Sequence, residues 1–308
     1  MKCGANALTN GRFKTVSVRE NGGTFMATFT NRATLTYNGV ATDSNIVTGE
    51  IVDSITAAKT AVSDSYSAGD TITYVISLVN TGASAVTGVT ITDDLGAYPS
   101  GINTLIPLTY TDGSVLYYSN GTLQTTPTVT AGDRLVISGI TVPANGNAVI
   151  VYSAQANSYA PPAEGSLITN TAQITGNGIA NTVTVTETVN ALSEANLSIA
   201  KALSPQTVTE NSELTYTFTI SNYGSKALTA ADNAVITDTF NPVLKNITVT
   251  LNGTALAEGT GYTYSETTGE FATTAGLVTV PAAAYTQAVT GEWTAEPATA
   301  VLRITGTI

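Results

Sequence analysis

Hydrophobic and polar residues alternate with a period of two along much of the chain, most clearly in TITYVISLV (71–79) and TVTVTETV (182–189). This period is typical of strands that bury one face, and no segment sustains the 3.6-residue period of an amphipathic helix. Asn-Gly pairs, which favour tight hairpin turns, occur between such segments at 38–39, 120–121, 177–178 and 252–253. The pattern therefore predicts an all-β protein.

The sequence also contains an internal repeat with an offset of 142 residues. The two copies read DTITYVISLVNTG (70–82) and SELTYTFTISNYG (212–224). Short alternating strands separated by turn residues are typical of β-sandwiches. We therefore expect two tandem immunoglobulin-like β-sandwiches, repeat one at 54–190 and repeat two at 191–308.

Repeat one ends in a segment, LITNTAQITGNGIANTVTVTETV (167–189), that predicts a closing hairpin with its turn at Asn177-Gly178. Repeat two shows no counterpart, so we expect it to lack its closing hairpin. A similar segment, FTNRATLTYNGVATDSNIVTGEIV (29–52), instead precedes repeat one. Its identities are Thr30, Asn31, Ala33 and Thr36, which match Thr169, Asn170, Ala172 and Thr175. We assign 1–53 to an N-terminal arm and a donor β-hairpin.

An incomplete sandwich and a detached hairpin complement each other. Missing strands leave unpaired N–H and C=O groups and an open apolar groove, while a hairpin alone is marginally stable in water. Since each hairpin runs directly into the next repeat, we expect hairpin 29–52 to complete repeat two of another copy. Such head-to-tail donor-strand complementation makes a homopolymer that extends as a filament. The alternative is that the hairpin is a remnant of a shortened repeat and that repeat two is a shorter variant.

Repeat one contains one Lys, Lys59, within the apolar strand SITAAKTAV (54–62). Asp93, which we favour over Asp94 because it has a counterpart in repeat two, ends a predicted strand, and Asn170 lies early in the closing hairpin. Burial lowers the pKa of a Lys and raises that of an Asp, which favours a neutral amine and a protonated acid. The amine can then attack the Asn side chain, release ammonia and form an isopeptide bond. The alternative is an ordinary Lys–Asp salt bridge with the Asn capping a turn.

These motifs (the Lys strand, GDTITYxIxxxNTG, VTITDDL and TNTAxIT) resemble the conserved repeat of bacterial and archaeal surface proteins known as domain of unknown function eleven. The resemblance covers most of 54–308, but repeat two has NYG for NTG and no closing TNTA. The Lys, Asp and Asn arrangement is also similar to collagen-adhesin-type pilin domains, which form Lys–Asn isopeptide bonds. Carried to repeat two, the resemblance implies a bond between chains from Lys201 to Asn31 of a neighbouring copy, promoted by Asp238.

Composition narrows the possible functions. A net charge of −11 argues against nucleic acid and anionic membrane surfaces as partners. With no His and one Cys, a histidine-ligated metal site, a His-based triad and a Cys-rich zinc site are excluded. We expect no metal, no cofactor and no enzymatic activity beyond autocatalytic isopeptide formation. Cys3 is either a free thiol on a loose arm or part of a disulfide with Cys3 of another copy.

No apolar run reaches the ~18 residues that span a membrane, and the opening MKCGANALTN lacks the apolar core of a secretory signal. The sequence therefore predicts a structural subunit of an extracellular fibre on a cell or spore surface, without membrane insertion. The alternative is a monomeric stalk or adhesin module of a larger surface protein. Residues 1–25 match neither repeat, and we expect them to form an arm that reaches another subunit.

Overall fold

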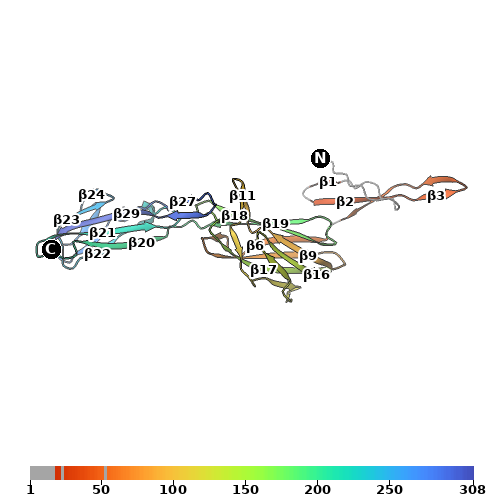
Figure 1. The fold of residues 1–308 in the computed structure, drawn as a ribbon. Helices are drawn as coiled ribbons and strands as arrows, with labels where there is room; N and C mark the ends of the chain where they lie inside the picture. Colours follow the sequence, from red (N-terminus) through yellow and green to blue (C-terminus); the bar gives the residue numbers. More distant parts are fainter. Residues whose placement is uncertain (1–17, 22–23, 52–53) are drawn as a thin grey trace.

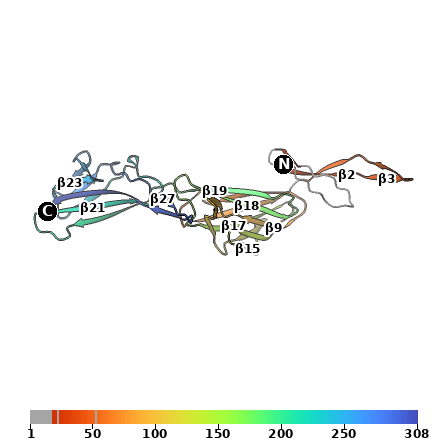
Figure 2. The same ribbon diagram turned by 45° about the horizontal axis from the view of Figure 1, so that its top comes forward.

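The computed structural model describes residues 18–21, 24–51 and 54–308, and Cys3 lies outside these ranges. Its regular structure is almost entirely strand, which confirms the predicted all-β class. Two sandwiches lie end to end, and strand β3 (Thr34–Tyr37) lies beyond the first of them (Figure 1, Figure 2). No helix in the described ranges is long and apolar enough to cross a membrane.

The N-terminal part is a long antiparallel hairpin with one additional strand. Its strands are β1 (Val18–Asn21), β2 (Thr24–Asn31), β3 (Thr34–Tyr37), β4 (Val40–Asp43) and β5 (Val47–Ile51). β2 pairs with β5 and β3 pairs with β4, while β1 pairs with the outer edge of β2. Asn38 and Gly39 form the hairpin turn with φ angles of 49° and 77°, the left-handed backbone that the Asn-Gly pair favours.

Repeat one is a sandwich of two sheets. The first has the order β14-β13-β17-β8-β6 with β12 also paired to β17, and the second has the order β15-β16-β9-β18-β19-β7. The first sheet comprises β6 (Ile55–Ala61), β8 (Thr71–Asn80), β12 (Leu108–Tyr110), β13 (Leu116–Ser119), β14 (Thr122–Leu123) and β17 (Gly146–Ala156). The second comprises β7 (Ser65–Tyr66), β9 (Val86–Asp93), β15 (Thr128–Ala131), β16 (Leu135–Val142), β18 (Leu167–Asn177) and β19 (Val183–Ala191). A short pair, β10 (Tyr98–Ser100) and β11 (Asn103–Leu105), lies outside both sheets.

The alternating pattern explains why these strands stack face to face. Along β8, Ile72, Tyr74, Ile76 and Leu78 point inward and are almost completely buried, and the residues between them point outward. The same alternation on the other strands produces one continuous apolar core between the sheets.

Asn177 and Gly178 form a turn, as predicted, in which the Ile179 backbone N–H donates a hydrogen bond of 3.2 Å to Gly176 O, but the loop between the two strands is longer than a two-residue hairpin turn. Strand β18 continues to Asn177, which pairs with Thr87 of β9, whereas the last β18–β19 pair is Ile174 with Val183. Gly178 alone of the two turn residues has a positive φ, at 92°. Pairing with β9 carries β18 beyond its last pair with β19, so this tertiary contact lengthens the loop of the hairpin.

Repeat two has its own apolar core and a smaller second sheet. Its first sheet has the order β20-β21-β29-β23-β24, its second the order β22-β26-β25, and β27 pairs with β28 as a separate hairpin. The strands are β20 (Leu197–Ser204), β21 (Glu213–Asn222), β22 (Thr237–Thr239), β23 (Lys245–Leu251), β24 (Thr254–Leu256), β25 (Tyr262–Tyr264), β26 (Glu270–Thr273), β27 (Ala284–Gln287), β28 (Trp293–Glu296) and β29 (Ala298–Thr307). A 3-10 helix spans Ala230–Asp232.

The two repeats share one sheet and differ in the other. In the first sheets, β20, β21 and β29 occupy the places of β6, β8 and β17. In repeat one, β9 pairs with β16 along one edge and with β18 along the other. In repeat two, β22 pairs with β26, and no strand in the described part of the chain pairs with its other edge. Repeat two therefore has an open edge where repeat one has its closing hairpin.

Candidate functional site

Lys59 lies on the inner face of β6, which is the edge strand of the first sheet in repeat one. The alternation along β6 turns both Ile55 and Lys59 into the core, where each residue is 4% exposed. β19 of the opposite sheet packs against this strand. The Lys59 side chain is thus enclosed, and the Tyr74 ring lies 5.0 Å from its Nζ.

Asp93, the last residue of β9, faces Lys59 across the core. Lys59 Nζ is 2.6 Å from Asp93 Oδ2, and Asp93 Oδ1 accepts a hydrogen bond of 3.0 Å from the Leu95 backbone N–H. Burial lowers the pKa of Lys59 below its ordinary value of 10.5, and the opposing attraction of Asp93 does not cancel this effect. A neutral, nucleophilic amine is therefore easier to reach at Lys59 than at a surface lysine.

Asn170 of β18 points into the same core and is fully buried. Its Nδ2 donates a hydrogen bond of 3.0 Å to the Tyr152 hydroxyl, which in turn donates one of 2.7 Å to Asp93 Oδ2. Asn170 Oδ1 and the Tyr74 hydroxyl are buried without a hydrogen-bond partner of normal geometry. The structure thus brings the three residues named for repeat one into a single buried cluster, in which Tyr152 joins Asp93 to Asn170.

Sequence reasoning missed the two tyrosines of this cluster. Tyr74 and Tyr152 lie opposite each other on β8 and β17, and their rings stack with centroids 5.4 Å apart. Burial raises the pKa of both hydroxyl groups, so both stay protonated at neutral pH. The only signal was that each Tyr falls at an inward position of an alternating segment, TITYVIS or VIVYSA, where ordinary core packing is the usual reason.

The neighbouring carboxylate, Asp94, does not enter the core. Asp94 Oδ1 accepts hydrogen bonds of 2.9 Å from the backbone N–H groups of Gly96 and Thr171. It therefore closes the turn after β9 and attaches that turn to β18. In the part of the chain that the structure describes, no three His, Cys, Asp or Glu residues group closely enough to hold a metal ion.

Lys201 of β20 and Asp238 of β22 hold the matching positions in repeat two. Lys201 Nζ is 2.5 Å from Asp238 Oδ2, and their side chains are 40% and 18% exposed, compared with 0% and 1% for the pair in repeat one. The rings of Tyr216, Phe218 and Phe240 lie 4.5, 5.3 and 5.3 Å from Nζ. These rings attract the ammonium group toward the inner face of the sandwich.

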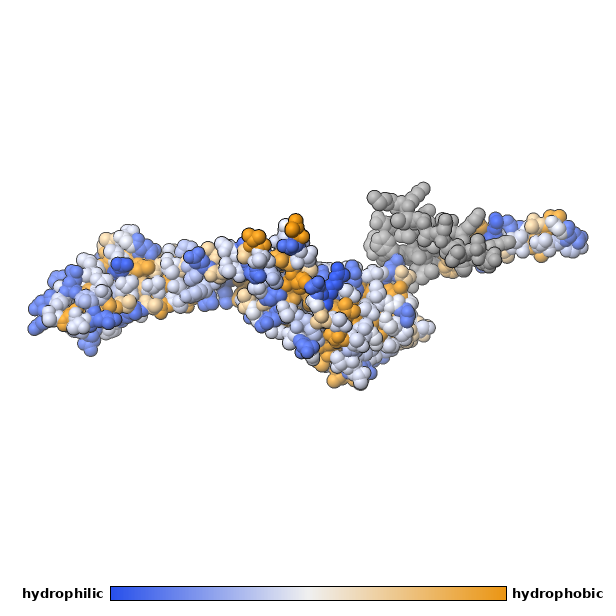
Figure 3. All heavy atoms as spheres, in the orientation of Figure 1, coloured by the Kyte–Doolittle hydropathy of each residue, from blue (hydrophilic) through white to orange (hydrophobic). Residues whose placement is uncertain are grey.

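Within one chain, the structure does not bring Asn31 to Lys201. Asn31 ends β2 and is exposed, and β2 and β20 lie on opposite sides of repeat one (Figure 1, Figure 2). Exposed apolar side chains gather at the outer end of this hairpin (Figure 3). Leu35 and Tyr37, on one face of β3, are 71% and 74% exposed. The hairpin thus presents an uncovered apolar face together with Asn31.

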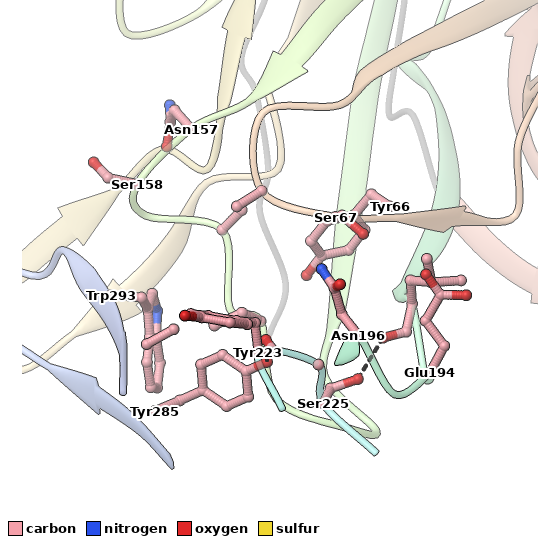
Figure 4. Close-up of a pocket in the computed structure, with 16 residues that line it drawn as sticks. Tyr66, Ser67, Asn157, Ser158, Glu194, Asn196, Tyr223, Ser225, Tyr285 and Trp293 are labelled. Carbon is pink, nitrogen blue, oxygen red and sulfur yellow. Dashed lines mark hydrogen bonds between the residues drawn. The ribbon is translucent and has the colours of Figure 1, made fainter. Parts of the chain in front are cut away.

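A second feature is a cavity of about 380 Å³ where the two repeats meet. Figure 4 shows the rings of Tyr223, Tyr285 and Trp293 together on its repeat-two side. The Trp293 backbone N–H donates a hydrogen bond of 2.8 Å to Ser158 O in repeat one, and its indole N–H is buried without a partner. These contacts attach the β27–β28 hairpin of repeat two to the loops of repeat one.

No protein-family model and no curated protein matches the chain. The resemblance to the domain of unknown function eleven is therefore not supported by a family match. Similar solved structures do include pilins. One is a 35 kDa C-terminal fragment of the major pilin GBS80 of Streptococcus agalactiae, with 14% identity, a TM-score of 0.35, and 61% of this chain and 68% of that chain covered.

A second similar structure is BcpA, the major pilin subunit of Bacillus cereus, with 10% identity, a TM-score of 0.34, and 89% of this chain and 74% of that chain covered. A third is a family 123 glycoside hydrolase from Clostridium perfringens, with 11% identity and a TM-score of 0.31. That match covers 45% of this chain and 27% of the hydrolase. Likenesses of this size establish neither a family nor a function for the chain.

Proposed function

We propose that the chain is a structural, non-enzymatic subunit of an extracellular surface fibre that assembles by strand addition between copies. In this assembly the donor hairpin (29–52, of which 29–51 are described) of one copy completes the second sheet of repeat two in the next. The observation that carries the proposal is the uncovered inner face of β20 beside the open edge of β22. In repeat one, the closing hairpin β18–β19 covers the equivalent face of β6.

The open edge of repeat two has the properties of an acceptor for strands. β22 has three residues, whereas its counterpart β9 has eight. Leu197 of β20 is 43% exposed, whereas Ile55 at the equivalent position of β6 is 4% exposed. An added strand would pair with the backbone of β22, and burying a side chain such as Leu197 would stabilise the contact by up to about 2 kcal/mol.

The donor hairpin has the side chains that such a site requires. At its inward positions, Asn31, Ala33 and Leu35 match Asn170, Ala172 and Ile174 of β18. The three residues of β18 are fully buried, whereas Leu35 is 71% exposed. In the register of β18, the donor hairpin would cover β20 and bring Asn31 next to Lys201 and Asp238.

Chain direction favours a neighbouring copy as the acceptor. β19 ends at Ala191 and β20 begins at Leu197, so the closing hairpin leads directly into the next repeat. The donor hairpin likewise ends at Ile51, close to the start of β6 at Ile55. With the same geometry, it would complete a sandwich that lies before its own repeat one, and in our proposal this sandwich is repeat two of a second copy. Contacts of this head-to-tail kind extend into filaments when they do not close into rings.

Lys–Asn isopeptide bonds would make this fibre covalent. In each bond, Lys Nζ joins Asn Cγ, the Cγ–Nδ2 bond breaks and ammonia leaves, so no cofactor or oxidant is required. Within repeat one the bond would join Lys59 to Asn170, and between copies it would join Lys201 to Asn31. The contact of each Lys with an inward Asp, at 2.6 and 2.5 Å, supports both assignments.

A variant on one face of the donor hairpin tests strand addition. Full-length protein is examined by negative-stain electron microscopy and light scattering. Leu35→Asp places a charge where Ile174 is buried in β18, and we expect it to prevent fibres. Thr36→Asp, on the other face of β3, is the matched control, because its counterpart Thr175 is exposed. Fibres formed equally by both variants would contradict the proposal.

Boiling in detergent and reductant, followed by electrophoresis, separates the covalent and non-covalent versions of the fibre. A ladder of multimers indicates bonds between copies, and the reductant removes any disulfide through Cys3. Polymers that become monomers only on boiling indicate strand addition alone. A protein that is monomeric in native buffer overturns the fibre and favours a monomeric stalk or adhesin module.

A further inference from the structure

We infer that Tyr152 delivers the proton to the departing nitrogen when Lys59 joins Asn170, and that Asp93 acts on Asn170 through this hydroxyl. The inference deepens the proposed function, because it rests on the proposed bond within repeat one. It assigns the contact with the reacting amide to Tyr152 and makes Asp93 the proton acceptor for the attacking amine.

A continuous chain of hydrogen bonds connects the two reacting nitrogens, Lys59 Nζ and Asn170 Nδ2. Lys59 Nζ is 2.6 Å from Asp93 Oδ2, and the same oxygen accepts the hydrogen bond of 2.7 Å from Tyr152. The Tyr152 oxygen is 3.0 Å from Asn170 Nδ2, the nitrogen that must leave. Among the hydrogen bonds of the described residues, none joins Asp93 to Asn170. Within these hydrogen bonds, a proton on Asp93 therefore reaches the leaving nitrogen through Tyr152.

The relay balances the reaction. Lys59, as a neutral amine, forms the Nζ–Cγ bond, and its surplus proton passes to Asp93. Asp93 then donates this proton to the Tyr152 oxygen, while the Tyr152 hydroxyl, which donates to Asp93 Oδ2 before the reaction, turns and passes its own proton to Asn170 Nδ2. The Cγ–Nδ2 bond then breaks with its electron pair on nitrogen, and ammonia leaves. Tyr152 and Asp93 return to their starting protonation states.

Because the cluster is buried, a side chain and not solvent must supply the proton to the leaving nitrogen. Lys59, Asp93, Tyr152 and Asn170 are each at most 4% exposed, so solvent does not reach the leaving nitrogen. An amide nitrogen is a poor leaving group unless it is protonated, and a positioned general acid typically contributes about 100-fold or more to the rate. Burial raises the pKa of Tyr152, so the hydroxyl carries its proton at neutral pH and can exchange it in a concerted step.

The same hydroxyl is missing from repeat two. Tyr74 pairs with Tyr152 across β8 and β17, whereas Tyr216 pairs with Ile304 across β21 and β29. Tyr216 therefore retains the position of Tyr74, and Ile304 replaces Tyr152. The inference therefore predicts that the Lys59 site within repeat one has the proton relay and that the Lys201 site between copies lacks it.

The test follows the mass of full-length protein over time after cell-free synthesis. Wild-type protein is expected to lose the mass of one ammonia, and Tyr152→Phe is expected to do so about 100-fold more slowly. Circular dichroism of both proteins checks that the fold is retained. If the wild type keeps its full mass, the proposed bond itself is absent. If the wild type loses ammonia and Tyr152→Phe does so at the same rate, the relay is overturned while the bond stands.

A second replacement separates the proton relay from a packing role. Site-specific incorporation of difluorotyrosine at 152 keeps the ring and hydroxyl but makes the hydroxyl more acidic. A proton donor of lower pKa is expected to accelerate the loss of ammonia and to shift its pH profile toward lower pH. An unchanged rate and profile would mean that Tyr152 only fills space, which contradicts the relay even if Tyr152→Phe fails to fold.

Discussion

Lys59 and Lys201 occupy the same position in the two repeats, yet the Lys59 side chain is 0% exposed and the Lys201 side chain is 40% exposed. Each contacts an inward Asp, and each lies beside a Tyr of the neighbouring strand. The difference lies in the second sheet, because β19 packs against β6 and no described strand does the same for β20. The exposure of Lys201 is therefore a direct measure of whether repeat two is completed.

Amine-reactive labelling should report assembly at Lys201. In dilute, unassembled protein we expect Lys201 to be modified, because its side chain is 40% exposed. In fibres it should be protected to the level of Lys59, which is enclosed in both states. Lys226, in the loop after β21, and Lys245, the first residue of β23, are both exposed and serve as controls that stay reactive. Peptide mass spectrometry gives the extent of modification, and equal labelling of Lys201 in fibres and monomers would place the donor hairpin elsewhere.

The sequence was sufficient for the alternating strands and for three residues of the buried cluster, Lys59, Asp93 and Asn170, but not for its two tyrosines. Period-two alternation predicted β8 and β19, and a single Lys in an apolar strand predicted a partnered, buried amine. These signals are readable because burial of one sheet face fixes which residues point inward. The Asn38-Gly39 turn was also predictable, since its left-handed backbone is a local preference of those two residues.

Other features depended on contacts between distant strands. The sequence does not show that Asp93 of β9 lies opposite Ala172 of β18, which places Asn170 beside Tyr152. Likewise, the sequence does not show that Asn177 pairs with β9, which lengthens the loop between β18 and β19. The docking of the β27–β28 hairpin on repeat one was not predicted, because its contacts involve loops without a periodic pattern.

Removing one partner of the buried pair in repeat one should strongly destabilise it. Asp93→Ala leaves Lys59 buried without a counter-charge, and such changes cost about 3–5 kcal/mol. We expect urea unfolding of repeat one to show this loss of stability. The intact mass should also show that the variant has not released ammonia. In the Asn170→Ala background, where the isopeptide bond cannot form, the double variant Lys59→Met/Asp93→Ala should lose less than the sum of Lys59→Met and Asp93→Ala, because it removes both charges together. Additive losses would show that the two side chains do not interact.

The lowered pKa of Lys59 gives repeat one a defined pH dependence. Asn170→Ala prevents the isopeptide bond and leaves Lys59 free to titrate. Between its lowered folded-state pKa and the ordinary value of 10.5, the unfolded chain binds more protons than the folded one. The free energy of unfolding should therefore rise with pH in that window, and the additional Lys59→Met change should remove the slope. Urea titrations from about pH 8 to about pH 10 measure it, and a slope that survives Lys59→Met belongs to other groups.

The junction between repeats should limit bending of the subunit. Gly291, in the β27–β28 turn, packs against Leu105 of repeat one with a φ of 103°, and an added Cβ would lie 2.6 Å from that side chain. Gly291→Val should therefore detach the hairpin from repeat one without disturbing either core. Small-angle scattering is expected to show a broader distribution of dimensions. Val289→Ala, at a fully exposed position of the same turn, is the control, and identical scattering from both variants would show that the hairpin does not fix the junction.

Adding a phenol hydroxyl to repeat two tests the proton relay and the bond between copies together. Ile304 occupies the place of Tyr152, and its replacement by Tyr would place a phenol opposite Tyr216, as in repeat one. We expect Ile304→Tyr to form covalently linked multimers faster than the wild type, because a proton donor would then lie between Asp238 and the incoming Asn31. Ile304→Phe adds the ring without the hydroxyl and should not accelerate the formation of these multimers. Equal acceleration by Phe would mean that ring packing, and not proton delivery, limits the bond between copies.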